Sequence, residues 1–599
     1  MRKLEKFDNL VSMFFTRARE LGDAPFLWAK SGGKWHSTSW AESARKVASL
    51  AAALKKLGLK PGDRVMLVSE NRPEWCLSDL AIMAAGGVTV PTYTTNTERD
   101  HQHIIDNSGA TMTIVSDAKL AKTLLPAILR TAGSAGHVVI GMEEMKLSQP
   151  GAIDFHDWNA LIAANPADVG EAEQAAARMK RADLACIIYT SGTGGSPRGV
   201  MQHHGAILCN VEGCCTVISE DFGWDDEVFL SFLPLSHAYE HTGGQHFPIG
   251  LGAQIYYSEG LDKLASNIEE VRPTLMVVVP RLFEVLRTRI SKQVEKQGKF
   301  ANYLLDRAVS IGGKKAAGKS SVLDLPMSLF LSRTLKPKLS KKFGGRIKAM
   351  VSGGAPLNPE VGVFFESLGI TFLQGYGQTE AAPVISCNRP KAGLKHDTVG
   401  PPLEGVEVRI AEDGEILVRG ELVMHGYWRN EAETARVLKD GWLHTGDIGL
   451  IDEKGRIKIT DRKKDIIVND KGDNVAPQKV EGMLTLQPEI MQAMIAGDRK
   501  PYMTAVLVPD PEWTQEWCAK TGAKCDLKAL REDPDYRAAI GAAVDRVNKD
   551  LSVIERVRRF ILADEPFTIE NQQLTPSLKI RRHILKEVYG ERLAGLYKG

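Results

Sequence analysis

The sequence of 599 residues predicts an α/β fold with a large N-terminal domain and a small C-terminal one. Short apolar runs alternate with helical patterns over most of the first 460 residues, as in parallel sheets that helices cover on both faces. From about Val399 the pattern changes to short alternating strands separated by glycine turns. The chain beyond Asp461 is more helical. We therefore expect the two domains to join near residues 461–464.

The first elements follow from local signals. Ser39 and Glu42 form a capping-box pattern that opens a helix ending near Leu57. A buried strand over 64–69 and a helix over 73–85 come next. Further apolar strands are expected at 88–91, 185–190, 274–280, 347–352 and 370–374. The alternating strands are expected at 405–410, 414–420 and 455–460.

Composition limits the class of protein. Hydrophobic residues make up 43% of the chain and charged residues 25%, which excludes a wholly disordered or fibrous chain. Lys plus Arg numbers 76 against 74 for Asp plus Glu, and this net charge of +2 is too small to attract the whole chain to nucleic acid. The eight cysteines are scattered, without a C-x-x-C pair. They predict reduced thiols in a cytoplasmic protein and not a disulfide scaffold or a zinc ribbon.

Three segments bear on membranes. Residues 1–22 predict an amphipathic helix, because a signal peptide would have a longer apolar region. The uncharged stretch 80–97 contains Gly86, Gly87 and Pro91, which exclude a continuous membrane helix. Residues 313–342, here called the basic segment, carry eight Lys or Arg and one acid, Asp324. This segment fits either a solvated helical face or contact with an anionic membrane surface.

A loop rich in glycine, serine and threonine follows an apolar strand, in IIYTSGTGGSPRGV (187–200). Glycines let backbone N–H groups turn toward a phosphate, hydroxyls add donors, and Arg198 adds charge. The segment lacks the Gly-Lys-Ser/Thr of the nucleotide-binding P-loop. By composition alone, a phosphate site and a plain connection both remain open.

This loop resembles the phosphate loop of the AMP-forming acyl-CoA synthetases, members of the adenylate-forming superfamily. Six more motifs resemble those of the family and occur in its order: LPLSHAYEH (233–241), MVSGGAPL (350–357), LQGYGQTEAAP (373–383), GWLHTGDIG (441–449), ITDRKKDIIVNDKGDNVAPQKVE (459–481) and LTPSLKIRR (574–582). The resemblance covers almost the whole chain. Seven motifs in order make coincidence negligible.

The resemblance implies a fold of two packed α/β sheets plus a small β-barrel-like subdomain, followed by a small mobile α+β domain. We divide the chain into an AMP-binding domain, 1–461, and a C-terminal domain, 462–599, that carries the catalytic lysine. It also implies a two-step reaction. A carboxylate attacks the α-phosphate of ATP to give an acyl-adenylate and pyrophosphate. A thiol, usually that of coenzyme A, then displaces AMP to leave a thioester.

The resemblance assigns roles in nucleotide binding. The phosphates would lie against Thr190, Ser191, Gly192, Thr193, Gly195 and Arg198. One face of the adenine would meet Gly354, Ala355 and Pro356. Tyr376 would stack on the other face, within a binding segment that comprises Gly375, Tyr376, Gly377, Gln378 and Thr379.

The same resemblance implies the chemistry. Thr379 would contact the α-phosphate. Glu380 would hold Mg²⁺ with the Thr190 hydroxyl nearby, since a hard cation prefers oxygen ligands. Asp447, assisted by Arg462, would bind both ribose hydroxyls.

Three residues of the C-terminal domain complete the set. Lys579 would stabilise charge on the α-phosphate and carboxylate as the adenylate forms, although Lys579, Arg581 and Arg582 alone would read as an ordinary basic surface run. Lys464 would lie at the hinge that turns the domain between the two steps. Gly472 would line the channel for the pantetheine arm of coenzyme A.

His237 has three interpretations. By resemblance it lies at the acyl pocket and orients the carboxylate. It is also compatible with a packed, hydrogen-bonded core histidine. In addition, HAYEH (237–241) satisfies the H-x-x-E-H pattern of a zinc protease class, in which His237 and His241 bind zinc and Glu240 is the base. The other six motifs oppose the zinc interpretation.

The phosphate loop departs from the family pattern twice. The family usually has a second Thr where this chain has Gly194, and a Lys where it has Arg198. Arg keeps the charge but not the compact geometry of an ammonium. These changes put the rate and the ATP affinity in question more than the reaction class.

Within the family the chain most resembles the long-chain fatty acid branch. The resemblance rests on Glu240, on VPRLFEVLRTRI (279–290), on the basic segment, and on Leu578 where many branches have Gly. We expect a fatty acid, ATP, Mg²⁺ and coenzyme A as small-molecule partners and no nucleic acid. A homodimer and peripheral contact with an anionic membrane are further expectations, in a cytoplasmic protein at most attached to the inner face of the membrane.

Two alternatives to the ligase stay open. A fatty acyl-AMP ligase would share the first step and pass the acyl group to a carrier-protein thiol. A non-catalytic acyl or nucleotide sensor is suggested only by the altered phosphate loop.

Overall fold

The computed structural model describes residues 2–132, 136–145, 153–190, 197–316, 318–319, 321–355, 357–463, 465–575 and 579–598, without the side chains of 281, 285, 335, 338 and 461. Several residues discussed above lie outside these ranges: Ser191, Gly192, Thr193, Gly194, Gly195, Pro356, Lys464 and Leu578.

The first sheet has seven strands and is parallel except for its last strand. Its order is β7 (Ile153–Asp157), β6 (His137–Gly141), β5 (Met112–Val115), β3 (Arg64–Val68), β4 (Val88–Thr92), β8 (Leu184–Thr190) and β9 (Arg198–His203). Strand β9 returns antiparallel to β8, with Thr190 opposite Arg198. The two ends of the phosphate loop are thereby held side by side.

The second sheet has eight strands and is parallel in its centre. Its order is β15 (Val384–Cys387), β14 (Phe372–Gly377), β13 (Ala349–Ser352), β12 (Leu275–Val278), β10 (Val228–Ser231), β11 (Gln254–Tyr257), β1 (Pro25–Ser31) and β2 (Lys34–Ser39). The edge strands β15 and β2 run antiparallel to their neighbours.

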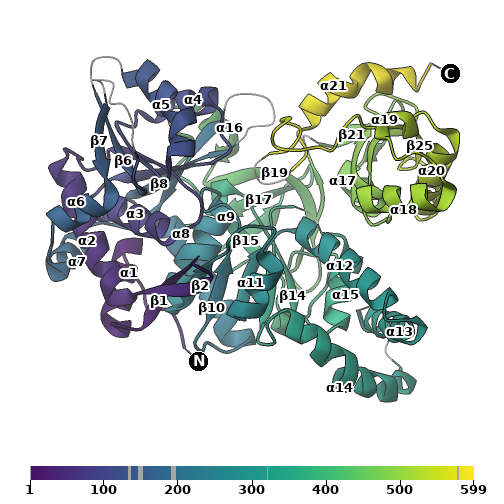
Figure 1. The fold of residues 1–599 in the computed structure, drawn as a ribbon, viewed down its shortest axis with the longest axis horizontal. Helices are drawn as coiled ribbons and strands as arrows, with labels where there is room; N and C mark the ends of the chain where they lie inside the picture. Colours follow the sequence, from purple (N-terminus) through teal and green to yellow (C-terminus); the bar gives the residue numbers. More distant parts are fainter. Residues whose placement is uncertain are drawn as a thin grey trace.

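Helices cover both sheets, and the main hydrophobic core lies between the sheets. That core contains side chains of both sheets and of α1 (Leu10–Leu21), α2 (Trp40–Lys56), α3 (Pro73–Ala84), α8 (His204–Asp221) and α10 (Phe247–Leu251). The outer face of the first sheet packs on α4 (Glu98–Ser108) and α5 (Ala118–Ala132). The outer face of the second packs on α11 (Leu264–Val271), α12 (Pro280–Glu295) and α15 (Pro359–Ser367), with α13 (Lys299–Ala316) and α14 (Leu325–Lys342) further out (Figure 1).

A smaller antiparallel sheet has its own core. It consists of β16 (Glu407–Ile410), β17 (Glu415–Arg419), β18 (Leu438–Lys439), β19 (Trp442–Ile451) and β20 (Ile457–Arg462), and α16 (Glu431–Val437) precedes β18. The expected strands at 405–410, 414–420 and 455–460 correspond to β16, β17 and β20. The expected apolar strands correspond to β3, β4, β8, β12, β13 and β14 within a few residues. The predicted α/β fold is confirmed.

The C-terminal part forms a compact unit at the upper right of Figure 1. Its sheets contain β21 (Ile467–Val468) with β22 (Asn474–Val475), and β23 (Ile490–Ala496) with β24 (Met503–Pro509) and β25 (Val557–Leu562). Its helices are α17 (Pro477–Leu484), α18 (Pro511–Thr521), α19 (Leu527–Leu530), α20 (Pro534–Lys549) and α21 (Arg582–Gly595). An ion pair at 2.8 Å between Lys292 of α12 and Glu512 of α18 joins this unit to the N-terminal part.

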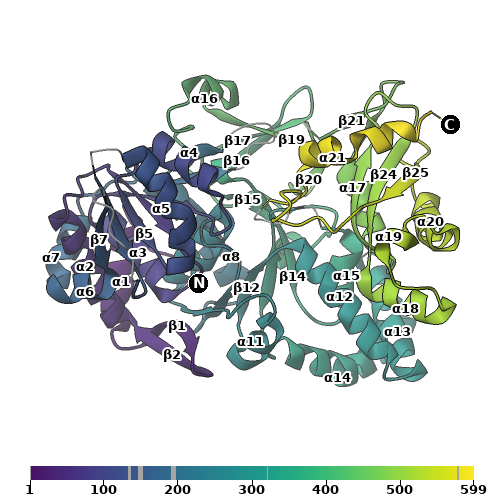
Figure 2. The ribbon, with the colours of Figure 1, turned by 45° about the horizontal axis from the view of Figure 1, so that its top comes forward.

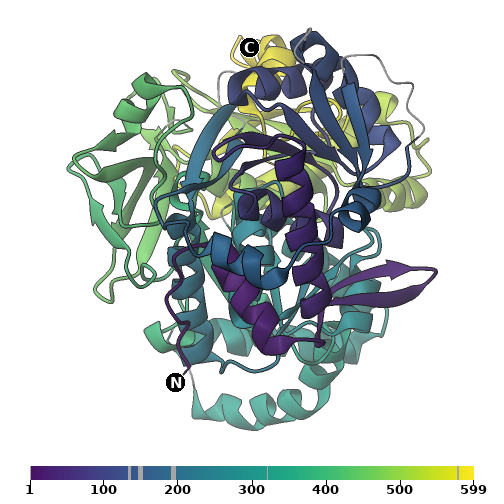
Figure 3. The same ribbon diagram turned by 90° about the vertical axis from the view of Figure 1, so that its left-hand side faces the viewer.

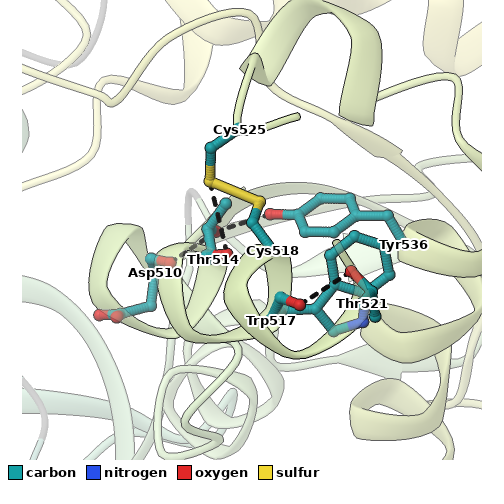
Figure 4. Close-up of a disulfide and its surroundings, with 7 residues drawn as sticks. All are labelled: Asp510, Thr514, Trp517, Cys518, Thr521, Cys525 and Tyr536. Atoms are coloured by element: carbon teal, nitrogen blue, oxygen red, sulfur yellow. Dashed lines mark hydrogen bonds between the residues drawn. A yellow bond between two sulfur atoms is a disulfide. The ribbon is translucent and has the colours of Figure 1, made fainter. Parts of the chain in front are cut away.

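One expectation about cysteines is wrong. Cys518 of α18 and Cys525 form a disulfide, with their Cα atoms 5.8 Å apart (Figure 4). The bridge closes a short loop over the end of α18, beside Thr514, whose hydroxyl bonds to that of Tyr536. The scattered positions of the cysteines in the sequence did not reveal this pairing. The pairing depends on where α18 ends, because the end of this helix sets the distance between Cys518 and Cys525. The other six cysteines are free thiols.

Within the described ranges, no helix is both long and apolar enough to cross a bilayer. The N-terminal amphipathic pattern corresponds to α1, whose apolar face is buried in the main core.

Candidate active site

The candidate site lies where strands of three sheets end. Thr190 ends β8 and Arg198 begins β9, while Gly354 and Ala355 follow β13. Strand β14 carries Gly375, Tyr376 and Gly377 and leads through Gln378 into a 3₁₀ turn, η3 (Thr379–Ala381), that holds Glu380. The carboxyl ends of parallel strands are the usual place for ligands in α/β sheets.

Two glycines of the site have different structural reasons, a close backbone approach at Gly377 and a positive φ at Gly354. A Cβ on Gly377 would lie 1.8 Å from the carbonyl oxygen of Pro383, so a larger residue cannot occupy this position without moving the backbone. The same carbonyl accepts a 2.9 Å hydrogen bond from the Gln378 N–H. Gly354 has a φ of +82°, a left-handed conformation that glycine adopts without strain.

Asp447 is a buried carboxylate with both oxygens engaged. The Tyr376 hydroxyl donates to Oδ2 at 2.7 Å, and Arg462 Nε donates to Oδ1 at 3.0 Å. Asp447 and Arg462 are aligned on paired strands β19 and β20. The structure thus brings together Tyr376, Asp447 and Arg462, which the sequence placed in three separate motifs.

Glu380 is held by a residue that the sequence analysis did not single out. The Tyr427 hydroxyl donates to Glu380 Oε1 at 2.8 Å. The Glu380 carbonyl accepts from Met424 N–H at 2.9 Å, and the neighbouring Thr379 carbonyl accepts from Gln202 Nε2 at 2.7 Å. These bonds fix the Thr379–Glu380 turn against β9 and the segment before α16.

Arg198 is already paired in this structure. Its guanidinium forms an ion pair with Glu433 of α16 and lies 4.8 Å from the centre of the Tyr427 ring. Glu433 also pairs with Arg436 at 2.6 Å. The phosphate-loop cation, the tyrosine that holds Glu380 and helix α16 therefore form one connected group. Glu433 lies 235 residues from Arg198, and no spacing in the sequence indicated the contact.

Lys579 reaches the same region from the C-terminal unit. In Figure 2 the chain before α21, in yellow, extends from that unit toward the N-terminal part. Burial, together with the positive charge of Arg462, lowers the pKa of Lys579 to about 8, while Asp447 and Glu380 act in the opposite direction. The lysine, the two carboxylates and the arginine thus lie within electrostatic reach of one another.

The segment that carries Lys579 is tied to its own domain. Thr575 N–H donates to the Lys579 carbonyl at 2.8 Å, and Lys579 N–H donates to the Thr575 hydroxyl at 3.0 Å. Three residues on, Arg582 makes two hydrogen bonds of 2.6 Å to the buried Glu481 carboxylate of α17. A bidentate buried pair of this kind fixes both position and orientation.

His237 also faces this region. It caps the short helix α9 (Ala238–Glu240), its Nδ1 accepting from Tyr239 N–H at 3.2 Å. Burial lowers its pKa to about 3, and the charge of Lys579 contributes in the same direction. A neutral imidazole beside Lys579 could form a hydrogen bond to a carboxylate.

The zinc interpretation of HAYEH is wrong. Glu240 turns away and accepts from the Ser231 hydroxyl at 2.6 Å, and His241 bonds to Asp79 at 2.9 Å. His237, Glu240 and His241 therefore do not share a centre, and the one cluster of three potential ligands among the described residues is a different one.

That cluster joins Asp79, His241 and His246 in the main core. A π-helix, η1 (His241–His246), brings the two imidazoles to one side, with their Nε2 atoms 3.3 Å apart. Gln245 Nε2 donates to Asp79 Oδ2 at 2.7 Å, the same oxygen that bonds to His241. Both Nδ1 atoms have no hydrogen-bond partner in the described structure, whereas metal-binding histidines normally donate from the second nitrogen. We interpret the group as a buried hydrogen-bonded network.

The hydrogen bond described for Gly472 is made within its own turn and not to the residues above. The glycine occupies the turn between β21 and β22 with a φ of +87°, and its N–H donates to the Asn469 carbonyl within that turn.

The fold, with Lys579 brought from a separate C-terminal unit to residues at the strand ends of the large part, is that of an adenylate-forming enzyme. Models of two families match the chain: AMP-binding enzyme over residues 14–428 and AMP-binding enzyme C-terminal domain over 464–599. The chain belongs to the AMP-binding enzyme family.

Known relatives are similar over nearly the full length. The long-chain-fatty-acid–CoA ligase FadD15 of Mycobacterium tuberculosis is 32% identical over 98% of this chain and 97% of its own. The peroxisomal long chain acyl-CoA synthetase 6 of Arabidopsis thaliana is 32% identical over 94% of this chain and 82% of its own. The long-chain-fatty-acid–CoA ligase 6 of Mus musculus is 30% identical over 99% and 87%.

Solved structures share the fold at lower identity. The adenylation domain of a carboxylate reductase from Mycobacterium chelonae has a TM-score of 0.76 at 23% identity, over 99% of this chain and 92% of its own. The anthranilate CoA ligase AuaEII has a TM-score of 0.72 at 19% identity, over 99% of each chain.

Proposed function

We propose that this protein is a long-chain fatty acid–CoA ligase. It activates a long-chain fatty acid with ATP through an acyl-adenylate and transfers the acyl group to coenzyme A, giving fatty acyl-CoA, AMP and pyrophosphate. One observation carries this conclusion. The chain is 30–32% identical in sequence, over nearly its full length, to long-chain fatty acid ligases of a bacterium, a plant and an animal. The same relatives favour neither the carrier-protein loader nor the sensor.

In the first step a fatty acid carboxylate oxygen attacks the α-phosphorus of ATP, and the bond to pyrophosphate breaks. The proposed role of Lys579 is to offset the negative charge that gathers on the α-phosphate. Thr379 would contact the same phosphate, and His237, kept neutral, would orient the fatty acid carboxylate. Asp447, with Arg462, would accept hydrogen bonds from the ribose.

The adenine and the remaining phosphates would bind around this centre. We propose that Tyr376 and the Gly354–Ala355 segment enclose the adenine, and that Thr190 and Arg198 flank the β- and γ-phosphates. Pro356 and the phosphate-loop residues Ser191, Gly192, Thr193 and Gly195 keep the roles proposed from the sequence.

The residues present fit Mg²⁺ bound with ATP. Glu380 offers a carboxylate whose Oε1 is oriented by Tyr427, and Thr190 offers a hydroxyl at the end of β8. Mg²⁺ is usually held by one or two such oxygen ligands together with substrate phosphates. When bound, the ion would neutralise phosphate charge. Glu380 and Thr190 would hold it.

The second step needs the C-terminal domain to move. We propose that residues 462–599 turn about Lys464 as one unit, which withdraws Lys579 and brings the Gly472 turn to the coenzyme A channel. The thiol sulfur then attacks the acyl carbonyl carbon and AMP leaves.

One assay tests this function. Purified protein with ATP, Mg²⁺ and palmitate should release AMP and form palmitoyl-CoA only when coenzyme A is present. Acyl-AMP without thioester would instead identify a carrier-protein loader. Absence of ATP–pyrophosphate exchange with palmitate and with shorter, aromatic and branched acids would leave the sensor.

Three expectations about the setting of the enzyme are also proposals. We propose a cytoplasmic location with peripheral contact to an anionic membrane, which cell fractionation at low and high salt tests. A homodimer is proposed from the sequence analysis, and sedimentation velocity tests it.

A further inference from the structure

Five large apolar side chains are exposed together at the beginning of α14 and in the 3₁₀ turn before it. We call them the apolar tip: Val322, Leu323, Leu325, Leu329 and Phe330. Their exposed fractions are 79%, 88%, 61%, 54% and 45%. Isolated apolar residues on a surface are ordinary, but five within nine residues form a patch of the kind that marks an interaction site.

The helix that carries the apolar tip is itself well packed on the rest of the molecule. Further along α14, Leu331 and Leu339 are buried in the core beneath the second sheet. The helix is therefore packed on the molecule by these residues, while the apolar tip stays exposed. Figures 1 and 3 show α14 at the lower edge of the molecule, where nothing of the described chain covers it.

Positive charge surrounds the tip. Lys315 and Lys319 precede it and are exposed, and Arg333, Lys341 and Lys342 follow it and are exposed. Leu325, Leu329 and Arg333 are spaced by four residues, so the apolar end passes into the basic part along one face of the helix. An apolar end followed by cations is the arrangement of helices that lie in the headgroup region of a bilayer.

The one acid of the basic segment does not oppose an anionic partner. Asp324 is buried, and its carboxylate is paired with Lys314 at 3.1 Å and with Arg307 at 3.8 Å. Residues 299–346 contain eleven Lys or Arg and two Asp. The exposed charge of this hairpin of helices is accordingly positive.

We propose that α14 docks the enzyme on an anionic lipid bilayer, with the apolar tip inserted among the acyl chains and the surrounding lysines and arginines against the headgroups. The inference deepens the proposed function, because a long-chain fatty acid partitions into bilayers and docking would place the enzyme at its substrate.

Vesicle binding tests the proposal without turnover. The variant Leu323→Ser/Leu325→Ser/Leu329→Ser removes apolar surface from the tip and leaves every cation. A matched control, Leu450→Ser/Val553→Ser/Val588→Ser, changes three side chains exposed by 46%, 66% and 51% on other elements. Both are compared with the parent by co-sedimentation with vesicles of phosphatidylcholine, with and without phosphatidylglycerol.

The parent and the control variant should bind phosphatidylglycerol vesicles at low salt, and the tip variant should bind them about tenfold or more weakly. Equal binding by all three proteins would overturn the proposal. So would a parent dimer, in the absence of lipid, that only the tip variant dissociates, because the tip would then bind a second copy of the chain. ATP–pyrophosphate exchange with dissolved fatty acid should be equal in all three proteins, and its absence would argue against the proposed function separately.

Discussion

The hydroxyl of Tyr427 lies 2.8 Å from Glu380 Oε1 and donates a hydrogen bond to it. Replacing Tyr427 by Phe keeps the ring under Arg198 and removes only this donor. A hydrogen bond to a charged group is worth about 1.5–3 kcal/mol. We therefore expect Tyr427→Phe to slow ATP–pyrophosphate exchange by about tenfold or more and to raise the Mg²⁺ concentration at half-maximal rate.

The exposed Tyr303→Phe is the matched control and should leave both quantities unchanged. If Tyr427→Phe lowered the rate at every Mg²⁺ concentration by the same factor, a role through Glu380 would be excluded.

Lys579 should act in adenylation only. We expect Lys579→Ala to lower ATP–pyrophosphate exchange by at least about 100-fold and to spare thioester formation from supplied acyl-AMP. Lys586→Ala, an exposed lysine of α21, is the control. Equal loss in both half-reactions would contradict a lysine that leaves the site before the thiol arrives.

The pH dependence of adenylation should report the same lysine. The pKa of Lys579 is lowered to about 8, and the ammonium is the form proposed to act, so kcat/KM for ATP should fall above about pH 8. In Lys579→Arg, whose guanidinium stays charged, any remaining activity should lack this alkaline limb. An unchanged limb in that variant would assign the ionisation to another group.

Arg198 and Glu433 should act as a pair. We expect Arg198→Ala and Glu433→Ala each to raise KM for ATP severalfold, and the double variant to differ from the product of the two effects by a coupling of about 1 kcal/mol. Strict additivity would show that Arg198 reaches ATP without help from Glu433.

Glu240 predicts a pH-dependent stability. Burial raises its pKa from 4.5 to about 8. Between these values the folded protein holds a proton that the unfolded chain has lost, so stability decreases as pH rises from about 4.5 to 8. Glu240→Gln removes this loss and should raise the free energy of unfolding by up to about 3 kcal/mol at pH 7, with the gain vanishing near pH 4.5.

Thermal unfolding of Glu240→Gln and of the exposed control Glu295→Gln at pH 5 and pH 8 measures this difference. A Tm increase that is the same at both pH values would rule out ionisation of Glu240 as its cause.

Local sequence was sufficient for most of the fold. Ser39 caps α2 through a bond from Glu42 N–H, as its position before an apolar helix predicts, and the run 64–69 contains β3. Such elements depend on neighbours a few residues away. The family could be predicted because its motifs occur in order along the chain, and the two family models that match residues 14–428 and 464–599 confirm it.

The contacts that orient the site were not predictable in this way. Tyr427 and Glu380 lie 47 residues apart, and Arg198 and Glu433 lie 235 apart. Each pair depends on how the small sheet and α16 close over β9, which no periodicity encodes. The sequence did not predict the π-helix that brings His241 and His246 together. The five-residue spacing of the two histidines matches neither the α-helical nor the extended period.

The bidentate pair between Arg582 and Glu481 limits how the lysine can leave. Glu481 of α17 holds Arg582, three residues after Lys579. A small local movement of the segment that carries Lys579 would therefore have to break a buried ion pair. Rotation of the entire unit leaves the pair intact and breaks exposed contacts such as Lys292–Glu512 instead. In the proposed reaction the easier route is therefore all-or-none: the ammonium would depart together with residues 462–599, and the timing of thioester formation would be a property of domain rotation.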